Sequence, residues 1–362
     1  YNSAGIFLSA EKMLTPRHSL SLITYGAPTK RASQSATTQE VYDMTGTIYY
    51  NSYWGYQEGV KRNSRIVKSF DPTAIIASDF KISESQRLRT GLAYHYSMYS
   101  NSALSFYNAP DPRPDYYRNL PSFQTDETIA DQIRREWGFD NGEPVNDKVS
   151  QIDWESLYLA NYKNNQINPT GTAKYAVERR HNDLMETALN STYTNQINSK
   201  LRLTAGIEAK YAKDINYKTM DDLLGGNQWI DIDQFAERDL NIDPNPNMDK
   251  IQNDLNNPDK VIKKGDMFGY KYDVNIIHSS AFIQNEWNLT QLDIYYAAQL
   301  TYTQFGRHGY MRNGRAPENS YGPGQVWWFV DPSFKAGATY KINRRNRTYA
   351  HVLAETRETL PS

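Results

Sequence analysis

The stretch LRLTAGIEAKY, residues 201–211, alternates strictly between two kinds of side chain. Every second residue is apolar or aromatic: Leu201, Leu203, Ala205, Ile207, Ala209 and Tyr211. The residues between them are polar or small: Arg202, Thr204, Gly206, Glu208 and Lys210. A period of two indicates a β-strand with unlike faces, whereas an amphipathic helix needs apolar spacings of three and four. The stretch therefore predicts a strand in a sheet whose two faces meet different surroundings.

The same alternation recurs along the chain. It is clear at 88–98, 292–302 and 334–342, and weaker at 4–13, 18–26, 74–82, 185–193, 277–287 and 347–355. Together these stretches predict about ten strands. Their polar faces carry the charges Arg89, Arg202, Glu208, Lys210, Asp293, Lys335 and Lys341.

The predicted connections between strands differ sharply in length. Short turns are expected near 15–17, 83–85, 196–198, 288–290 and 343–345, and long loops at about 26–65, 99–178, 213–274 and 306–329. Short and long connections in alternation are typical of outer-membrane barrels, which have tight periplasmic turns and extended outer loops. The fold class that we predict is all-β, an antiparallel transmembrane β-barrel, with residues 1–362 forming part of one barrel domain.

Composition agrees with a wall that is wetted on one side. The chain of 362 residues is 39% hydrophobic but 13% aromatic, with 28 Tyr, and its formal charge is −1. Such a charge gives no electrostatic basis for binding nucleic acid. The absence of cysteine excludes thiol catalysis, cysteine-ligated metals and disulfides.

Membrane insertion by helices is not expected, because no apolar run approaches the roughly 20 residues that a spanning helix needs. A transmembrane strand needs only about 9–11 residues, of which every second one faces lipid. The N-terminal residues YNSAGIFLSAEK lack the pattern of a signal peptide. We therefore expect the sequence to begin partway through the natural protein.

No catalytic motif is present, so no enzyme is predicted. The six histidines show no metal-ligand spacing, and no nucleophile elbow, Walker loop or dinucleotide fingerprint occurs. The loops are instead rich in aromatic residues that could stack on a ligand or pack a loop against itself. The candidate ligand-binding residues are Trp54, Tyr56, Tyr116, Tyr117, Trp229, Trp327 and Trp328.

One loop run resembles a calcium-binding pattern. Oxygen-bearing side chains recur at Asp243, Asn245, Asn247, Asp249 and Asp254. Calcium loops place such ligands at alternate positions, but they also need a glycine at the sharp turn, where this chain has Met248. A turn-rich loop built on Asx side chains is the alternative interpretation.

Several loop phrases resemble a known family. The phrases are YNSYWGYQEG (50–59), IRREWGFDNGEPVN (133–146), IDWESLYLANYKN (152–164), DDLLGGNQWIDIDQFAERD (221–239), NDLNNPDKVIKKGDMFGYKYD (253–273) and MRNGRAPENSYG (311–322). They are similar to TonB-dependent receptors of Bacteroidetes-type bacteria, which often carry a carboxypeptidase-like N-terminal extension. The resemblance implies a 22-stranded barrel in the bacterial outer membrane, closed by a plug domain that this chain does not contain.

The resemblance also implies a function and partners. A bulky nutrient or metal chelate would be caught by the outer loops and imported when the TonB–ExbB–ExbD complex acts on the plug, with a surface lipoprotein as a further partner. Iron chelates, cobalamin, glycans and peptides are all compatible as cargo. The alternatives are a passive ten-stranded porin or adhesin, and a soluble, aromatic-rich carbohydrate-binding β-protein.

Overall fold

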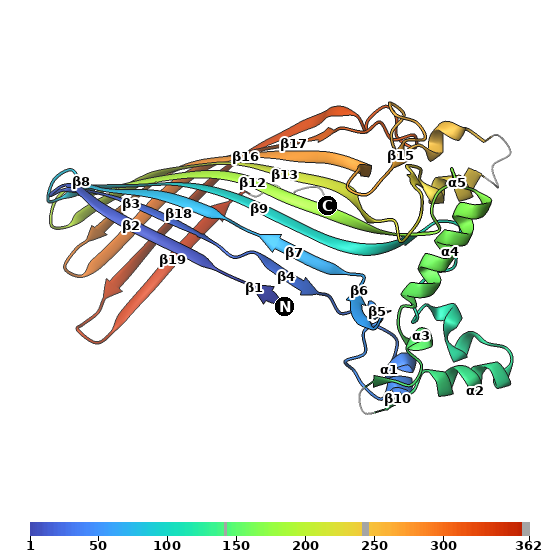
Figure 1. Cartoon of the computed structure of the whole chain (residues 1–362). Coiled ribbons are helices and arrows are strands. Elements are labelled where there is room, and N and C mark those ends of the chain that lie inside the picture. The colour runs from blue at the N-terminus through green and yellow to red at the C-terminus, as the bar shows by residue number, and fades with distance from the viewer. Residues whose placement is uncertain (141–142, 241–245, 357–362) are drawn as a thin grey trace.

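The structure, a computed structural model, describes residues 1–140, 143–240 and 246–356 (Figure 1). Within this part of the chain a single antiparallel sheet of thirteen strands dominates. Its members are β1 (Asn2–Ser3), β2 (Ile6–Thr15), β3 (His18–Gly26), β4 (Thr29–Ala32), β7 (Ile66–Phe70), β8 (Thr73–Lys81), β9 (Gln86–Phe106), β12 (Tyr175–Gln196), β13 (Leu201–Asp222), β16 (Met267–Asn288), β17 (Leu292–Gly309), β18 (Gly322–Lys341) and β19 (Arg347–Glu355). Each predicted strand has a counterpart among them.

The thirteen strands follow ten antiparallel passes across the sheet. Two residues separate β1 from β2, β3 from β4, and β7 from β8, and in each case both members continue the same pass. Pro28 and Pro72 lie in two of these interruptions, where a residue without a backbone N–H cannot contribute to the ladder. The sequence predicts about ten strands, which equals the number of passes. The interruptions within three of the passes are not predicted.

The strand registers confirm the two-faced alternation. Leu92 of β9 lies opposite Leu189 of β12 and Ile76 of β8, so apolar residues of successive strands share one face. Farther along the sheet, Ile207 of β13 and Leu300 of β17 both lie opposite Ala281. Leu92 and Ile207 are about half exposed, at 45% and 51%. This side is called the apolar face, and the side that carries Arg89 and Lys210 is called the polar face.

The connections lie at opposite ends of the sheet according to their length (Figure 1). The turns at 16–17, 82–85, 197–200, 289–291 and 342–346 form one end, as predicted. The long connections form the other end, together with all five α-helices of the described residues. These helices are α1 (Gln39–Thr45), α2 (Glu127–Glu136), α3 (Asp147–Ser150), α4 (Trp154–Ile167) and α5 (Gln234–Leu240).

The loops are shorter than predicted because the strands are longer. β12, β13 and β16 each contain 22 residues, about twice what a tilted strand needs to cross a bilayer. Their distal halves carry charged and polar residues on both faces, so the alternation fades there although the backbone ladder continues. The remaining connections run over 33–65, 107–174, 223–266 and 310–321, and the first of them holds the small hairpin of β5 (Trp54–Gln57) and β6 (Val60–Asn63).

The other short elements lie within the same long connections. They are η1 (Tyr117–Asn119), η2 (Pro121–Phe123), β10 (Phe139–Asp140), β11 (Glu143–Pro144), β14 (Trp229–Ile230), η3 (Met248–Ile251) and β15 (Val261–Ile262). In the described part of the chain, none of the helices has the length and apolar character needed to cross a membrane.

Candidate functional site

The polar face of the sheet is organised by ion pairs between neighbouring strands. Lys210 of β13 lies 2.9 Å from Glu186 of β12, and Lys341 of β18 lies 2.5 Å from Asp293 of β17. Arg87 of β9 forms a bidentate pair with Asp79 of β8, which Arg89 also approaches. Opposite charges facing one another stabilise the pairing of strands. The polar face therefore carries several compensated charge pairs, which suit contact with water or with a polar protein surface.

At the loop end, the long connections pack onto both faces of the extended strands. On the apolar side, Trp154, Ile152 and Leu157 form a core with Val177 of β12 and Leu224. On the opposite side, a second core joins Met220 of β13 and Phe268 of β16 with loop residues. We call the described residues of the segments 33–65, 107–174, 223–266 and 310–321 the loop lobe. Because it has cores of its own, the loop lobe is a folded structure and not a set of independent loops.

Helix α4 is fixed in the loop lobe by one buried polar side chain. The amide of Asn161 is fully buried and makes five hydrogen bonds. Its Oδ1 accepts from the backbone N–H groups of Lys174 and Tyr175 at 2.7 and 3.1 Å. Its Nδ2 donates to the carbonyls of Tyr175, Leu223 and Leu224 at 2.8 to 3.0 Å. Asn161 thus ties α4 to β12 and to the segment after β13.

Trp54 and Tyr56 lie together on the β5–β6 hairpin. Their rings meet edge to face at 5.5 Å, and the Lys61 ammonium lies 4.6 Å from the centre of the Trp54 ring. Both side chains are half-buried. Trp54 also lines a cavity of about 510 Å³ that includes Tyr49 and Gln151. Among the aromatic residues that the sequence predicts to bind a ligand, Trp54 is the one that lines this cavity.

Sequence reasoning missed two residues of this cavity. Tyr50 is buried and donates a hydrogen bond to the carbonyl of Ser150 at 2.7 Å, and burial raises the pKa of its hydroxyl far above its ordinary value. Gln151 is only 2% exposed, and its amide nitrogen and oxygen have no hydrogen-bond partner among the described residues. A buried amide is normally paired, so an unpaired one is notable beside a cavity. No periodic pattern surrounds Gln151 that could have indicated its burial.

Tyr116 and Tyr117 form a separate aromatic cluster in the loop lobe. Their ring centres are 4.7 Å apart, and Tyr117 also meets Phe123 at 5.4 Å. The Arg118 guanidinium donates to the Tyr117 hydroxyl at 2.9 Å, which lowers the pKa of Tyr117. Tyr117 is half exposed, so this cluster offers ring surface to the outside.

Three predicted ligand residues lie elsewhere than expected. Trp229 is 6% exposed and belongs to the second core of the loop lobe, so it packs the lobe and offers no ring face to a ligand. Trp327 and Trp328 lie on β18 and not in a loop. Trp328 lies opposite Gln304, which lies opposite Ile277, so Trp328 is on the apolar face. Trp327 is adjacent to it in the strand and therefore lies on the opposite face.

The residues of the calcium pattern are only partly described. Asp243 and Asn245 lie outside the described residues. Asn247 caps η3 by accepting from the N–H of Asp249 at 3.0 Å. Asp254 accepts from the backbone of Asn256 and Arg312 and from the side chain of Asn257. These bonds are those of an Asx-rich turn, and calcium binding stays a prediction.

Comparison with known proteins gives a likeness in fold but not in sequence. No protein-family model matches the chain, and no curated protein sequence matches it. Among solved structures, the ferric-catecholate import receptor Fiu from E. coli K12 in its open form is similar over 97% of this chain and 46% of its own, with a TM-score of 0.50 and 9% identity. The unliganded ferric citrate transporter FecA is similar over 96% of this chain and 35% of its own, with a TM-score of 0.53 and 5% identity.

The chain therefore spans less than half the length of either structure. The likeness establishes that the sheet has the fold of an outer-membrane β-barrel wall.

Proposed function

We propose that this chain forms part of the wall and the external loops of a TonB-dependent receptor in a bacterial outer membrane. The observation that carries the proposal is the apolar face of the sheet. Leu22, Ile76, Leu92, Ile207 and Leu300 lie on it, and each of them is between 45% and 54% exposed. A soluble protein rarely exposes so broad an apolar surface, whereas a barrel wall meets hydrocarbon with it.

On this proposal, the opposite face lines the interior. The compensated charges Arg87–Asp79, Lys210–Glu186 and Lys341–Asp293 would meet water or the plug domain. The cargo class is a bulky nutrient or metal chelate, in keeping with the loop phrases and with the cargo named for Fiu and FecA. The loop phrases further favour the Bacteroidetes-type branch and a surface lipoprotein partner.

The loop lobe would capture the cargo. Its cavity combines the Trp54 ring with the unpaired amide of Gln151, an arrangement in which an aromatic face and a polar group could hold one ligand. Tyr117 provides a further ring, which is half exposed. Capture at this end would place the ligand on the side away from the short turns. TonB–ExbB–ExbD would act through the plug on the side of the short turns.

The test is energy-dependent uptake by cells that carry the full-length receptor. Growth on a panel of iron chelates, cobalamin, glycans and peptides as sole sources would identify the cargo. Deletion of TonB should then abolish uptake while leaving surface binding of the cargo intact. Uptake that persists without TonB would instead indicate the passive porin. Extraction of the protein without detergent would reject the membrane placement altogether.

A further inference from the structure

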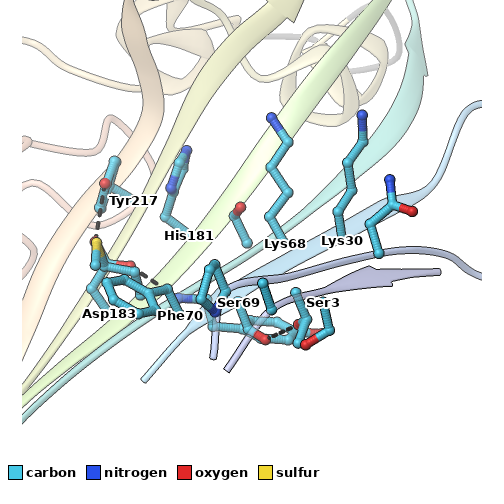
Figure 2. A pocket seen from close by; sticks show the side chains of 15 residues that line it. Ser3, Lys30, Lys68, Ser69, Phe70, His181, Asp183 and Tyr217 are labelled. Carbon is cyan, nitrogen blue, oxygen red and sulfur yellow. Dashed lines mark hydrogen bonds between the residues drawn. The ribbon is translucent and has the colours of Figure 1, made fainter. Parts of the chain in front are cut away.

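On the N-terminal strands, the apolar residues of the apolar face end at one row, and lysines occupy the next row toward the loop lobe. Along β9 this face carries Leu92, Tyr94, Tyr96 and Met98, and the next residue on it is Ser100. Lys68 of β7 lies opposite Ser100, and Lys30 of β4 lies opposite Lys68. Two ammonium groups therefore stand side by side, one residue pair beyond the apolar surface and toward the loop lobe. Figure 2 shows both side chains extending in the same direction.

These lysines lack a local counter-charge. No carboxylate of the described residues lies within ion-pair distance of either ammonium. Asp221 attracts Lys68 over a longer distance, but its carboxylate is already held by Arg179 at 2.7 Å. Like charges directly opposite one another on neighbouring strands destabilise a sheet. An anion placed between Lys30 and Lys68 would remove that repulsion.

A cavity of about 660 Å³ adjoins the pair. Its lining includes apolar residues of the row below the lysines, namely Ala4, Pro28, Phe70 and Met98. The ring of Phe70 lies over Gly26, where an added Cβ would come within 2.9 Å of it. The cavity thus has a cationic part next to the loop lobe and an apolar part next to the apolar face.

The one carboxylate that lines the cavity is occupied by other donors. Asp183 accepts from the Tyr217 hydroxyl at 3.1 Å and from the Tyr99 N–H at 3.3 Å (Figure 2). His181 stacks on Tyr217 with ring centres 4.3 Å apart, which fixes this end of the cavity. Asp183 is thus held by these two donors at the His181 end of the cavity and forms no ion pair with Lys30 or Lys68.

We propose that this cavity binds a phosphorylated lipid of the outer leaflet. Its phosphate would lie between Lys30 and Lys68, and its acyl chain would run over Phe70 and Met98 onto the apolar face. Lysines near the membrane surface attract anionic lipid headgroups, and the order of polar and apolar residues here follows that of such a lipid. The inference rests on the proposed membrane function, because only that placement brings the apolar face into contact with lipid.

The experiment titrates the intact, full-length receptor in neutral detergent with diphosphoryl lipid A and measures bound lipid by native mass spectrometry. The double variant Lys30→Gln/Lys68→Gln should bind about thirtyfold more weakly, since each lysine near an anionic lipid contributes about fivefold. The variant Lys30→Arg/Lys68→Arg should retain binding. The matched control Lys81→Gln/Lys335→Gln removes the same charge from the polar face and should bind like the wild type.

The other outcomes overturn the inference. Unchanged affinity in the Lys30→Gln/Lys68→Gln variant would show that the phosphate is held elsewhere. Displacement of the lipid by inorganic phosphate at equal concentration would identify a soluble anion and not a lipid as the ligand. Both results would leave the proposed function intact, whereas a receptor that needs no detergent to stay in solution would reject that function first.

Discussion

Ile207 on β13 and Leu300 on β17 lie in one row of the apolar face, each paired in register with Ala281 on the strand between them. Gln299 precedes Leu300 in sequence and lies on the polar face, where its side chain donates to Thr301. Two adjacent residues of one strand therefore meet opposite environments. This relationship gives a direct test of the membrane placement.

Leu300→Arg should prevent efficient assembly, because an arginine on the lipid face near the bilayer midplane costs about 2–4 kcal/mol. Gln299→Arg should assemble normally, since its charge would lie on the polar face. Folding into bilayers, followed by the heat-dependent gel mobility of the barrel, measures both. Equal assembly of the two variants would contradict the assignment of the faces.

Trp154→Ala should loosen the loop lobe without unfolding the sheet. Trp154 is fully buried, its Nε1 donates to the Arg62 carbonyl at 3.2 Å, and the Arg62 guanidinium lies 4.2 Å from the centre of its ring. Loss of a buried tryptophan costs about 3–5 kcal/mol. Amide hydrogen exchange should increase in α4 and along the β5–β6 hairpin, with strands at the turn end unaffected.

Tyr162→Ala is the matched control on the same helix, because Tyr162 is 61% exposed. Its exchange pattern should equal that of the wild type. If both substitutions had the same small effect, the core around Trp154 would not hold the lobe together.

Asn161→Asp should destabilise the loop lobe more than its small change in shape suggests. The aspartate would keep acceptors for Lys174 and Tyr175, but it would turn a carboxylate oxygen toward three carbonyls that now accept from the amide. Each buried group left unsatisfied costs about 1–3 kcal/mol. Lowering the pH should partly rescue the variant, because a protonated carboxyl can donate one hydrogen bond. Local opening energies from hydrogen exchange at two pH values would measure this, and a loss that does not depend on pH would contradict it.

The sheet could be predicted closely from the sequence, because period-two alternation is a local property. Ile207 and Glu208 indicate opposite faces of a strand without knowledge of its neighbours. The same reasoning fails where both faces become polar, as at Tyr217 and Lys218 near the end of β13, since the ladder continues there without any alternation. The pairing of Lys30 with Lys68 could not be predicted for a related reason, because β4 lies in a segment that the sequence predicts to be a loop.

The loop lobe could be predicted only in outline. The sequence predicts the long connections that form it, although the longer strands shorten each of them. The packing between distant segments is not predicted, because it depends on contacts such as the 2.7 Å ion pair of Arg62 with Asp222, 160 residues apart. For the same reason Trp229 was interpreted as an exposed ligand residue. Nothing in its neighbouring residues distinguishes a tryptophan that fills a core from one that offers its ring.

Asp231 should make the stability of the loop lobe depend on pH. Its carboxylate is 2% exposed, and Oδ1 accepts from Asn253 at 2.8 Å and from the Gly269 N–H at 2.9 Å. Oδ2 has no partner among the described residues, and burial raises the pKa of this carboxyl above its ordinary value. Between the ordinary value near 3.9 and the raised one, the folded lobe holds the proton more tightly than the unfolded chain. Stability should therefore fall as the pH rises through this window.

Asp231→Asn should remove that dependence and stabilise the lobe at neutral pH. The asparagine oxygen can keep both hydrogen bonds of Oδ1, and the unpaired charge is lost. Asp233→Asn is the contrasting control, because Asp233 caps α5 by accepting from Phe235 and Ala236 and pairs with Arg315 at 3.4 Å. It should lower stability at neutral pH. Hydrogen exchange of α5 and β14 between pH 4 and pH 7 would compare them. A wild-type lobe that grows more stable across this range, with that gain lost in Asp231→Asn, would show that hydrogen bonds and nearby cations outweigh burial at Asp231.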